Sequence, residues 1–169
     1  RRWYWITMSY GGTCCRAGRL IAIDPSLYAR TNAQKMGATH VIDPQEEDAR
    51  KQVYDIIPDG PDLVIEAAGP IAAVELMAQL RRRGTRWNVF GITTQETFEL
   101  DGGLTHFLEG RMDASFGTNP AAMQRAIRLM ESGLVNTEDI ISHRFKLSEI
   151  HRAIDVMGQP ERNKVMIRI

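Results

Sequence analysis

The sequence predicts an α/β fold with a doubly wound parallel sheet that is incomplete at its N-terminus. Three short apolar segments, RLIAID (19–24), HVID (40–43) and DLVIEAAG (62–69), alternate with stretches of helical character. Such alternation is typical of a parallel sheet with helices on its faces. The first segment ends on an acid, Asp24, and an acid at the end of an early strand suits the hydroxyl groups of a nucleotide ribose.

The first two helices are predicted from their end signals. The spacing predicts a helix from Ser26 to Met36, with Gly37 as its stop signal. A second helix is expected to start at Asp43, with Asp43 as N-cap and Pro44 in the first position, and to run to about Ile56.

The remaining elements follow the same alternation. We expect strands at residues 63–66, 87–90, 113–116 and 165–169, and helices over residues 70–84, 105–109, 119–130 and 150–157. Two of these helices carry apolar stripes at i, i+3, i+4 and i+7. We expect both stripes to pack in the core: Met123, Ala126, Ile127 and Met130 in one, and Ile150, Ala153, Ile154 and Met157 in the other.

Composition excludes several classes of partner. Lys and Arg together number 21, as do Asp and Glu, among 169 residues, so the formal net charge is zero. A nucleic-acid or anionic-membrane partner is therefore not expected, because both are recognised through a basic excess. Cys14 and Cys15 are adjacent and poorly placed to pair with each other, which favours a reducing cytoplasmic location. No apolar run approaches the roughly 20 residues that span a bilayer.

The first eighteen residues do not fit the pattern. Residues 3–7 (WYWIT) have strand-favouring chemistry, but residues 10–18 leave too little chain for a parallel crossover with its helix. The segment GGTCCRAG (11–18) does not match either Gly-rich phosphate-binding pattern. We therefore expect residues 1–18 to be an aberrant or truncated start, arising by truncation or by translation in a shifted frame.

No catalytic or metal-ligating residue stands out. His40, His106, His143 and His151 have no Cys, His or carboxylate partner at metal-binding spacing. No arrangement of Ser, His and Asp suggests nucleophilic catalysis. We expect no catalytic residue and no metal ligand in this chain.

From about Ala17 onward the chain resembles the medium-chain, zinc-type alcohol and polyol dehydrogenase family. The resemblance is carried by IAIDPS (21–26), KMGATHVIDP (35–44), DLVIEAAG (62–69), VFGIT (89–93), ISHRFKLSEIHRAIDVM (141–157) and NKVMI (163–167). It implies a Rossmann-like NAD-binding domain over residues 19–118, and a C-terminal segment, 119–169, that returns to the catalytic domain. The zinc ligands would lie in a catalytic N-terminal half outside this chain.

The same resemblance assigns the cofactor-binding residues. Asp24 would accept hydrogen bonds from the adenosine ribose and would disfavour a 2′-phosphate, so that NAD is preferred to NADP. Ala68 and Gly69 would let the backbone lie under the adenosine half, and Gly91, Ile92 and Thr93 would approach the nicotinamide carboxamide. Each position also has a simpler interpretation, as a helix cap for Asp24 and as ordinary tight turns for the others. The family often has Arg five residues after the acid, whereas here Ala29 occupies that position and Arg30 follows.

By that resemblance, the parent protein is an oxidoreductase that moves a hydride between NAD and a primary or secondary alcohol, with zinc as Lewis acid. A homo-oligomer, dimer or tetramer, is implied. The chain alone is expected to be inactive and to bind NAD weakly or not at all. Two alternatives are a zinc-free quinone-reductase-like member of the superfamily, which Asp24 disfavours, and a non-enzymatic nucleotide-binding Rossmann module, which the segment from Ile141 disfavours.

Overall fold

The computed structural model describes residues 18–46, 48–92 and 97–169. The predictions for residues 1–17 and for Thr93 fall outside the described residues. In the described part of the chain every strand pairing is parallel, as the sequence predicts.

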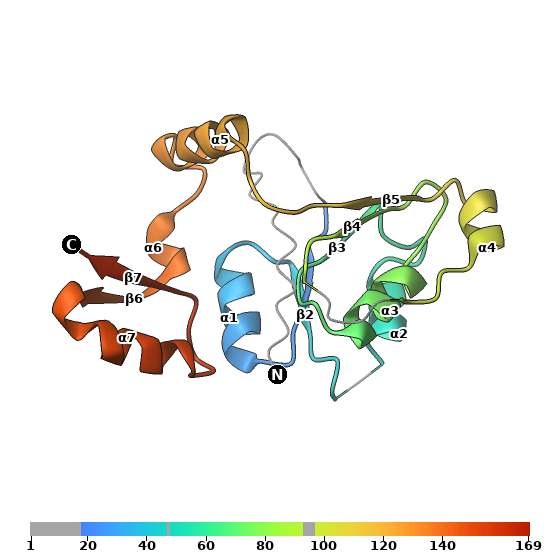
Figure 1. Cartoon of the computed structure of the whole chain (residues 1–169). Coiled ribbons are helices and arrows are strands. Elements are labelled where there is room, and N and C mark those ends of the chain that lie inside the picture. The colour runs from blue at the N-terminus through green and yellow to red at the C-terminus, as the bar shows by residue number, and fades with distance from the viewer. Residues whose placement is uncertain (1–17, 47, 93–96) are drawn as a thin grey trace.

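The strands form three separate ladders. Strand β1 (Ile21–Ile23) pairs with β2 (His40–Ile42). Strand β3 (Leu63–Glu66), β4 (Arg86–Val89) and β5 (Arg111–Ala114) pair in the order β3-β4-β5. Near the C-terminus β6 (Ile141–Lys146) pairs with β7 (Lys164–Arg168). Figure 1 shows β6 and β7 at the opposite side of the molecule from β3, β4 and β5.

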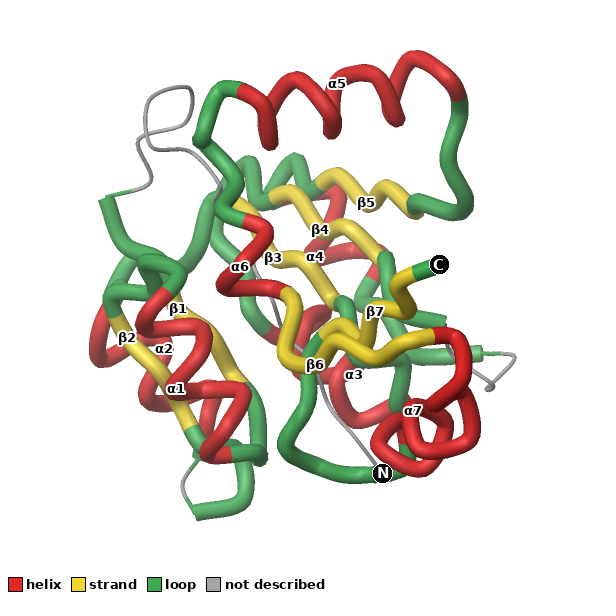
Figure 2. Tube along the Cα trace, turned by 90° about the vertical axis from the view of Figure 1, so that its left-hand side faces the viewer, coloured by secondary structure: helices red, strands yellow, loops and turns green. Residues whose placement is uncertain are grey.

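The order of the first five strands matches a doubly wound dinucleotide-binding sheet with one break. In such a sheet the strands lie in the order 3-2-1-4-5-6. If β1 to β5 are taken as its second to sixth strands, the expected order is β2-β1, then the first strand, then β3-β4-β5. Among the described residues the ladder is interrupted between β1 and β3, the place of that first strand. Figure 2 shows the β1–β2 pair beside, and separate from, β3, β4 and β5.

Local sequence signals set the helix boundaries. Helix α1 (Leu27–Lys35) begins after Ser26, whose side chain accepts a hydrogen bond from the N–H of Ala29. Helix α3 (Ile71–Gln79) follows Pro70, and α4 (Gly102–Phe107) follows Asp101. Asn119 caps α5 (Pro120–Glu131), as the Asn-Pro signal predicts.

The predicted start of the second helix is wrong. Helix α2 (Ala49–Ile56) begins after Asp48, which accepts a hydrogen bond from the N–H of Lys51. Asp43 instead accepts from the N–H of Gln45 at 2.9 Å and forms an ion pair with Arg30. A turn and a contact distant in sequence therefore replace the capping role that the local pattern predicts for Asp43.

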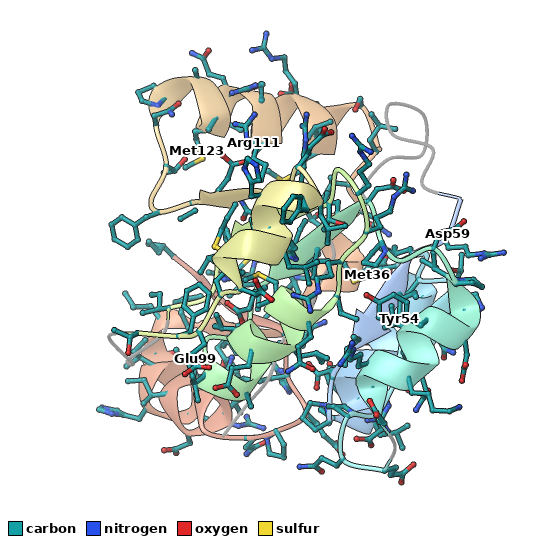
Figure 3. The ribbon with its side chains drawn as sticks, turned by 90° about the vertical axis from the view of Figure 1, so that its right-hand side faces the viewer. Met36, Tyr54, Asp59, Glu99, Arg111 and Met123 are labelled. Atoms are coloured by element: carbon teal, nitrogen blue, oxygen red, sulfur yellow. The ribbon has the colours of Figure 1, made fainter. Side chains whose placement is uncertain are left out.

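One hydrophobic core joins the two N-terminal ladders. It contains Ile23 and Ile42 from β1 and β2, Val64 and Trp87 from β3 and β4, and buried residues of α2, of α3 and of the C-cap of α3: Ala49, Val53, Ala73, Val74, Met77 and Leu80. The Tyr54 hydroxyl connects α2 to the chain just after α3 because it accepts from the N–H of Arg81 at 3.0 Å and donates to the Arg81 carbonyl at 2.8 Å. Figure 3 labels Tyr54 on α2. The core therefore holds β1 and β3 in one body although their ladders are separate.

The C-terminal segment has a small core of its own. Helix α6 (Thr137–Ile140) leads into β6, the short 3-10 helix η1 (Leu147–Glu149) follows, and α7 (Ile150–Met157) precedes β7. Phe145, Ala153 and Val156 form this second cluster.

Neither apolar stripe packs as predicted. On α5, Met123, Ile127 and Met130 are 50%, 44% and 39% exposed, and Figure 3 shows Met123 on this helix at the margin of the molecule. On α7, Ala153 is buried, but Ile154 and Met157 are 56% and 54% exposed. The spacing identifies an apolar face correctly, but it does not show whether a described element covers that face.

Candidate functional site

Asp24 lies at the carboxyl end of β1, where the nucleotide-binding interpretation requires it. Its N–H donates to the carbonyl of Ile42 at 3.1 Å, which continues the β1–β2 ladder by one residue. Its Oδ1 accepts from the N–H of Ser26 at 2.7 Å, and the residue is 2% exposed. Asp24 thus shapes the turn into α1, while Ser26 caps the helix. The simpler interpretation of Asp24 as the cap of this helix is therefore wrong, because Ser26 is the N-cap.

Arg30 lies next to Asp24 at this strand end. Its Nη1 donates to the backbone carbonyl of Asp24 at 2.6 Å and forms an ion pair with Asp43 Oδ2, also at 2.6 Å. Asp43 directly follows β2, so the ends of both paired strands carry a carboxylate. The hydrogen bond and the ion pair therefore hold the Arg30 guanidinium at this end of the sheet.

Glu66 organises the corresponding end of the second ladder. This last residue of β3 is completely buried, and its Oε1 accepts from the N–H groups of Ala68 and Gly69, both at 2.6 Å. Its backbone carbonyl accepts from the N–H groups of Phe90 and Gly91, at 2.8 and 2.9 Å. One residue therefore fixes the turn after β3 and the turn after β4.

The glycines allow these two turns to lie against each other. Gly69 has φ of 96°, a left-handed conformation, and a β-carbon there would overlap the carbonyl oxygen of Ile92. A β-carbon on Gly91 would lie 2.5 Å from Gly69 N and 2.6 Å from Glu66 Oε2. Both positions therefore require glycine, because any side chain would prevent the close approach of the turn after β3 and the turn after β4.

The structure brings most of the predicted cofactor residues together. Ala68, Gly69, Gly91 and Ile92 form one group at the ends of β3 and β4, and Ile92 is 80% exposed. Asp24 lies at the end of the other ladder. The N–H groups of Ala68, Gly69 and Gly91 all donate to Glu66. The N–H groups of these three residues are therefore already used within the protein, and a ligand at these turns would contact the surface of small residues.

Sequence reasoning missed Glu66 and the roles of Arg30 and Asp43. The signal for Glu66 was available, because it is an acid at the end of an apolar strand before a small-residue turn, the same feature that identifies Asp24. The ion pair between Arg30 and Asp43 joins residues of two different elements, and local pattern does not reveal such pairs.

The described residues contain no group of three or more His, Cys, Asp or Glu side chains that could hold a metal ion. Within the same residues, no helix has the length and apolar character needed to cross a bilayer.

The strand order and these turns at the carboxyl ends of the strands define a Rossmann-type α/β domain. A model of the zinc-binding dehydrogenase family matches residues 13–132, and the chain belongs to that family.

Relatives with named activities support this placement. The chain is 29% identical over 136 residues to D-arabitol-phosphate dehydrogenase of Enterococcus avium, covering 80% of this chain and 39% of that protein. It is 28% identical over 142 residues to sorbitol dehydrogenase of Bacillus subtilis, with 82% and 39% covered. The chain thus spans about two-fifths of the length of these relatives.

Solved structures of dehydrogenases have a fold similar to that of this chain. Alcohol dehydrogenase TADH from Thermus sp. ATN1 superposes with a TM-score of 0.82 at 25% identity, over 90% of this chain and 44% of that chain. A zinc-binding dehydrogenase from Sinorhizobium meliloti 1021, bound to NADP, has a TM-score of 0.79 at 29% identity, over 89% and 45%.

Proposed function

We propose that this chain is the cofactor-binding portion of an NAD-dependent, zinc-type oxidoreductase. The parent enzyme moves a hydride between nicotinamide and the carbinol carbon of an alcohol or polyol. The family membership and the names of the relatives support this reaction class. In this proposal residues 19–118 bind NAD and residues 119–169 belong with a catalytic domain.

The observation that carries the proposal is Asp24 at the carboxyl end of β1. In doubly wound sheets ligands bind outside the carboxyl ends of the strands, where the strand order reverses, and an acid there binds the ribose hydroxyls. The described residues fit such a ligand in two ways. Asp24 and Asp43 provide carboxylates at the ends of β1 and β2, and the small residues Ala68, Gly69 and Gly91 form the turns at the ends of β3 and β4.

The residues have separate roles in this proposal. Asp24 accepts the ribose hydroxyls, Ala68 and Gly69 lie under the adenosine half, and the chain from Gly91 through Ile92 and Thr93 faces the carboxamide. NAD supplies the hydride acceptor when it is bound. The described residues contain no group of three His, Cys, Asp or Glu side chains for a metal ion, and we assign no zinc ligand among them. We further propose a cytoplasmic location and a dimeric or tetrameric parent protein.

Titration of the isotopically labelled chain with NAD, followed by two-dimensional NMR, tests the proposal. We expect weak binding, with the amide signals of Asp24, Gly69 and Gly91 shifting together. Asp24→Asn keeps an oxygen for the N–H of Ser26, and it should weaken binding about tenfold because hydrogen bonds to a charged group contribute about 1.5–3 kcal/mol. Unchanged affinity in this variant, or shifts confined to other surfaces, would contradict the proposal.

A further inference from the structure

An ion pair between Arg30 and Asp43 lies beside the proposed ribose site. The side chains of Arg30 and Asp43 are only 13% and 14% exposed, so the pair is largely removed from solvent. The same Nη1 atom lies 2.6 Å from Asp43 Oδ2 and 2.6 Å from the backbone carbonyl of Asp24. The Arg30 guanidinium is therefore hydrogen-bonded to the backbone of Asp24, the residue proposed to bind the ribose.

The charges at this strand end determine which ribose it accepts. An Arg near the ribose accommodates a 2′-phosphate, because its planar fork of donors matches phosphate oxygens. Here the guanidinium is engaged by Asp43, and the two carboxylates of Asp24 and Asp43 outnumber the one cation among these three residues. A 2′-phosphate would meet excess negative charge and no uncommitted guanidinium from Arg30.

We propose that Asp43 is a specificity-determining residue that, by holding and neutralising Arg30, makes the site select NAD against NADP. This inference rests on the proposed function and deepens it. Asp24 disfavours the 2′-phosphate directly, whereas Asp43 acts through Arg30. Selectivity is thus divided between the ends of two neighbouring strands, which explains why an Arg next to the ribose acid is compatible with NAD preference.

The test compares affinities for NAD and NADP in Asp43→Asn at low salt. This variant keeps an oxygen that accepts from the N–H of Gln45, and it removes the charge that holds Arg30. The ratio of the dissociation constant for NADP to that for NAD should fall about tenfold, because a charged donor then becomes available to the phosphate. The shift should shrink as salt is added, since salt screens such interactions.

Two control variants test whether a change in the affinity ratio comes from the pair of Arg30 and Asp43. Asp55→Asn removes the same charge from an exposed pair with Lys51 on α2, in which the side chains are 72% and 62% exposed, and it should leave the ratio unchanged. In Arg30→Met combined with Asp43→Asn, both charges are lost, so the gain for NADP should disappear. Circular dichroism spectra of all variants establish that they are folded.

The outcomes separate this inference from the function on which it rests. Binding of NAD by the unaltered chain, with a changed ratio in Asp43→Asn alone, supports both. Binding of NAD with the same ratio in every variant overturns the role of Asp43 and leaves the proposed function standing. Absence of binding of either dinucleotide by any variant overturns both.

Discussion

Gly91 lies so close to Glu66 that a β-carbon on residue 91 would be 2.6 Å from the buried Glu66 Oε2. The same β-carbon would lie 2.9 Å from Ala68 N and 2.5 Å from Gly69 N. Two turns and a carboxylate therefore meet at a point that has no room for a methyl group. This contact fixes the relative position of the ends of β3 and β4.

Gly91→Ala should accordingly destabilise the fold. The added methyl group would have to displace backbone atoms of the neighbouring turn, and overpacking of this kind costs about 1–3 kcal/mol. Urea denaturation measures the loss. Gly102→Ala is the matched control because nothing lies within 4 Å of a β-carbon there. If the two variants were equally stable, the close contact would be refuted.

Removal of the Glu66 side chain should have a larger effect. Glu66→Ala leaves the N–H groups of Ala68 and Gly69 without their acceptor in a buried site. We expect a loss of about 2–6 kcal/mol, from about 1–3 kcal/mol for each of the two unpaired groups. Glu66→Gln keeps one acceptor oxygen and should lose less. A loss below about 1 kcal/mol in Glu66→Ala, measured by the same urea denaturation, would show that the carboxylate does not hold these turns.

The sequence predicts those elements well whose determining signals all lie within one short segment of the chain. The helix after Ser26, the helix after Asn119 and the parallel strands are confirmed. Asp43 shows where such reasoning fails, because its ion pair with Arg30 competes with the helix cap that its neighbours favour. Glu66 was missed for a different reason: its role depends on two turns that are distant in sequence and meet only in the folded chain.

The exposed stripe of α5 leads to a prediction about stability. Since Ile127 is 44% exposed, Ile127→Ser should change the free energy of unfolding of the chain by no more than about 0.5 kcal/mol. Val53 on α2 is 2% exposed, and Val53→Ala should cost about 2 kcal/mol because it removes buried methyl groups. Thermal denaturation of both variants checks this. A large loss in Ile127→Ser would mean that this face is packed within the chain, as its spacing predicts.

The ion pair between Arg83 and Glu109 should give a pH-dependent contribution to stability. The hydrogen bond from Arg83, together with its charge, lowers the pKa of Glu109 from the ordinary value of 4.5. A lowered pKa means that the contribution is present above the pKa of the unfolded chain and is lost as the pH falls through the lower pKa of the folded chain.

Comparing the free energy of unfolding of Glu109→Gln with that of the unaltered chain at several pH values tests this prediction. The substitution keeps the length of the side chain and the left-handed backbone, with φ of 54°, and removes only the charge. The variant should be slightly less stable than the unaltered chain at neutral pH, and the difference should vanish as the pH falls below the lowered pKa of Glu109 in the folded chain, and in high salt. A difference that persisted in acid would assign the effect to something other than this pair.

The most direct test of the account is a crystal structure of the chain grown with saturating NAD. We predict that the adenosine ribose hydroxyls lie within hydrogen-bond distance of the Asp24 carboxylate, with the dinucleotide running over the turns at Gly69 and Gly91. A dinucleotide bound on another surface, with its ribose away from the end of β1, would contradict the account.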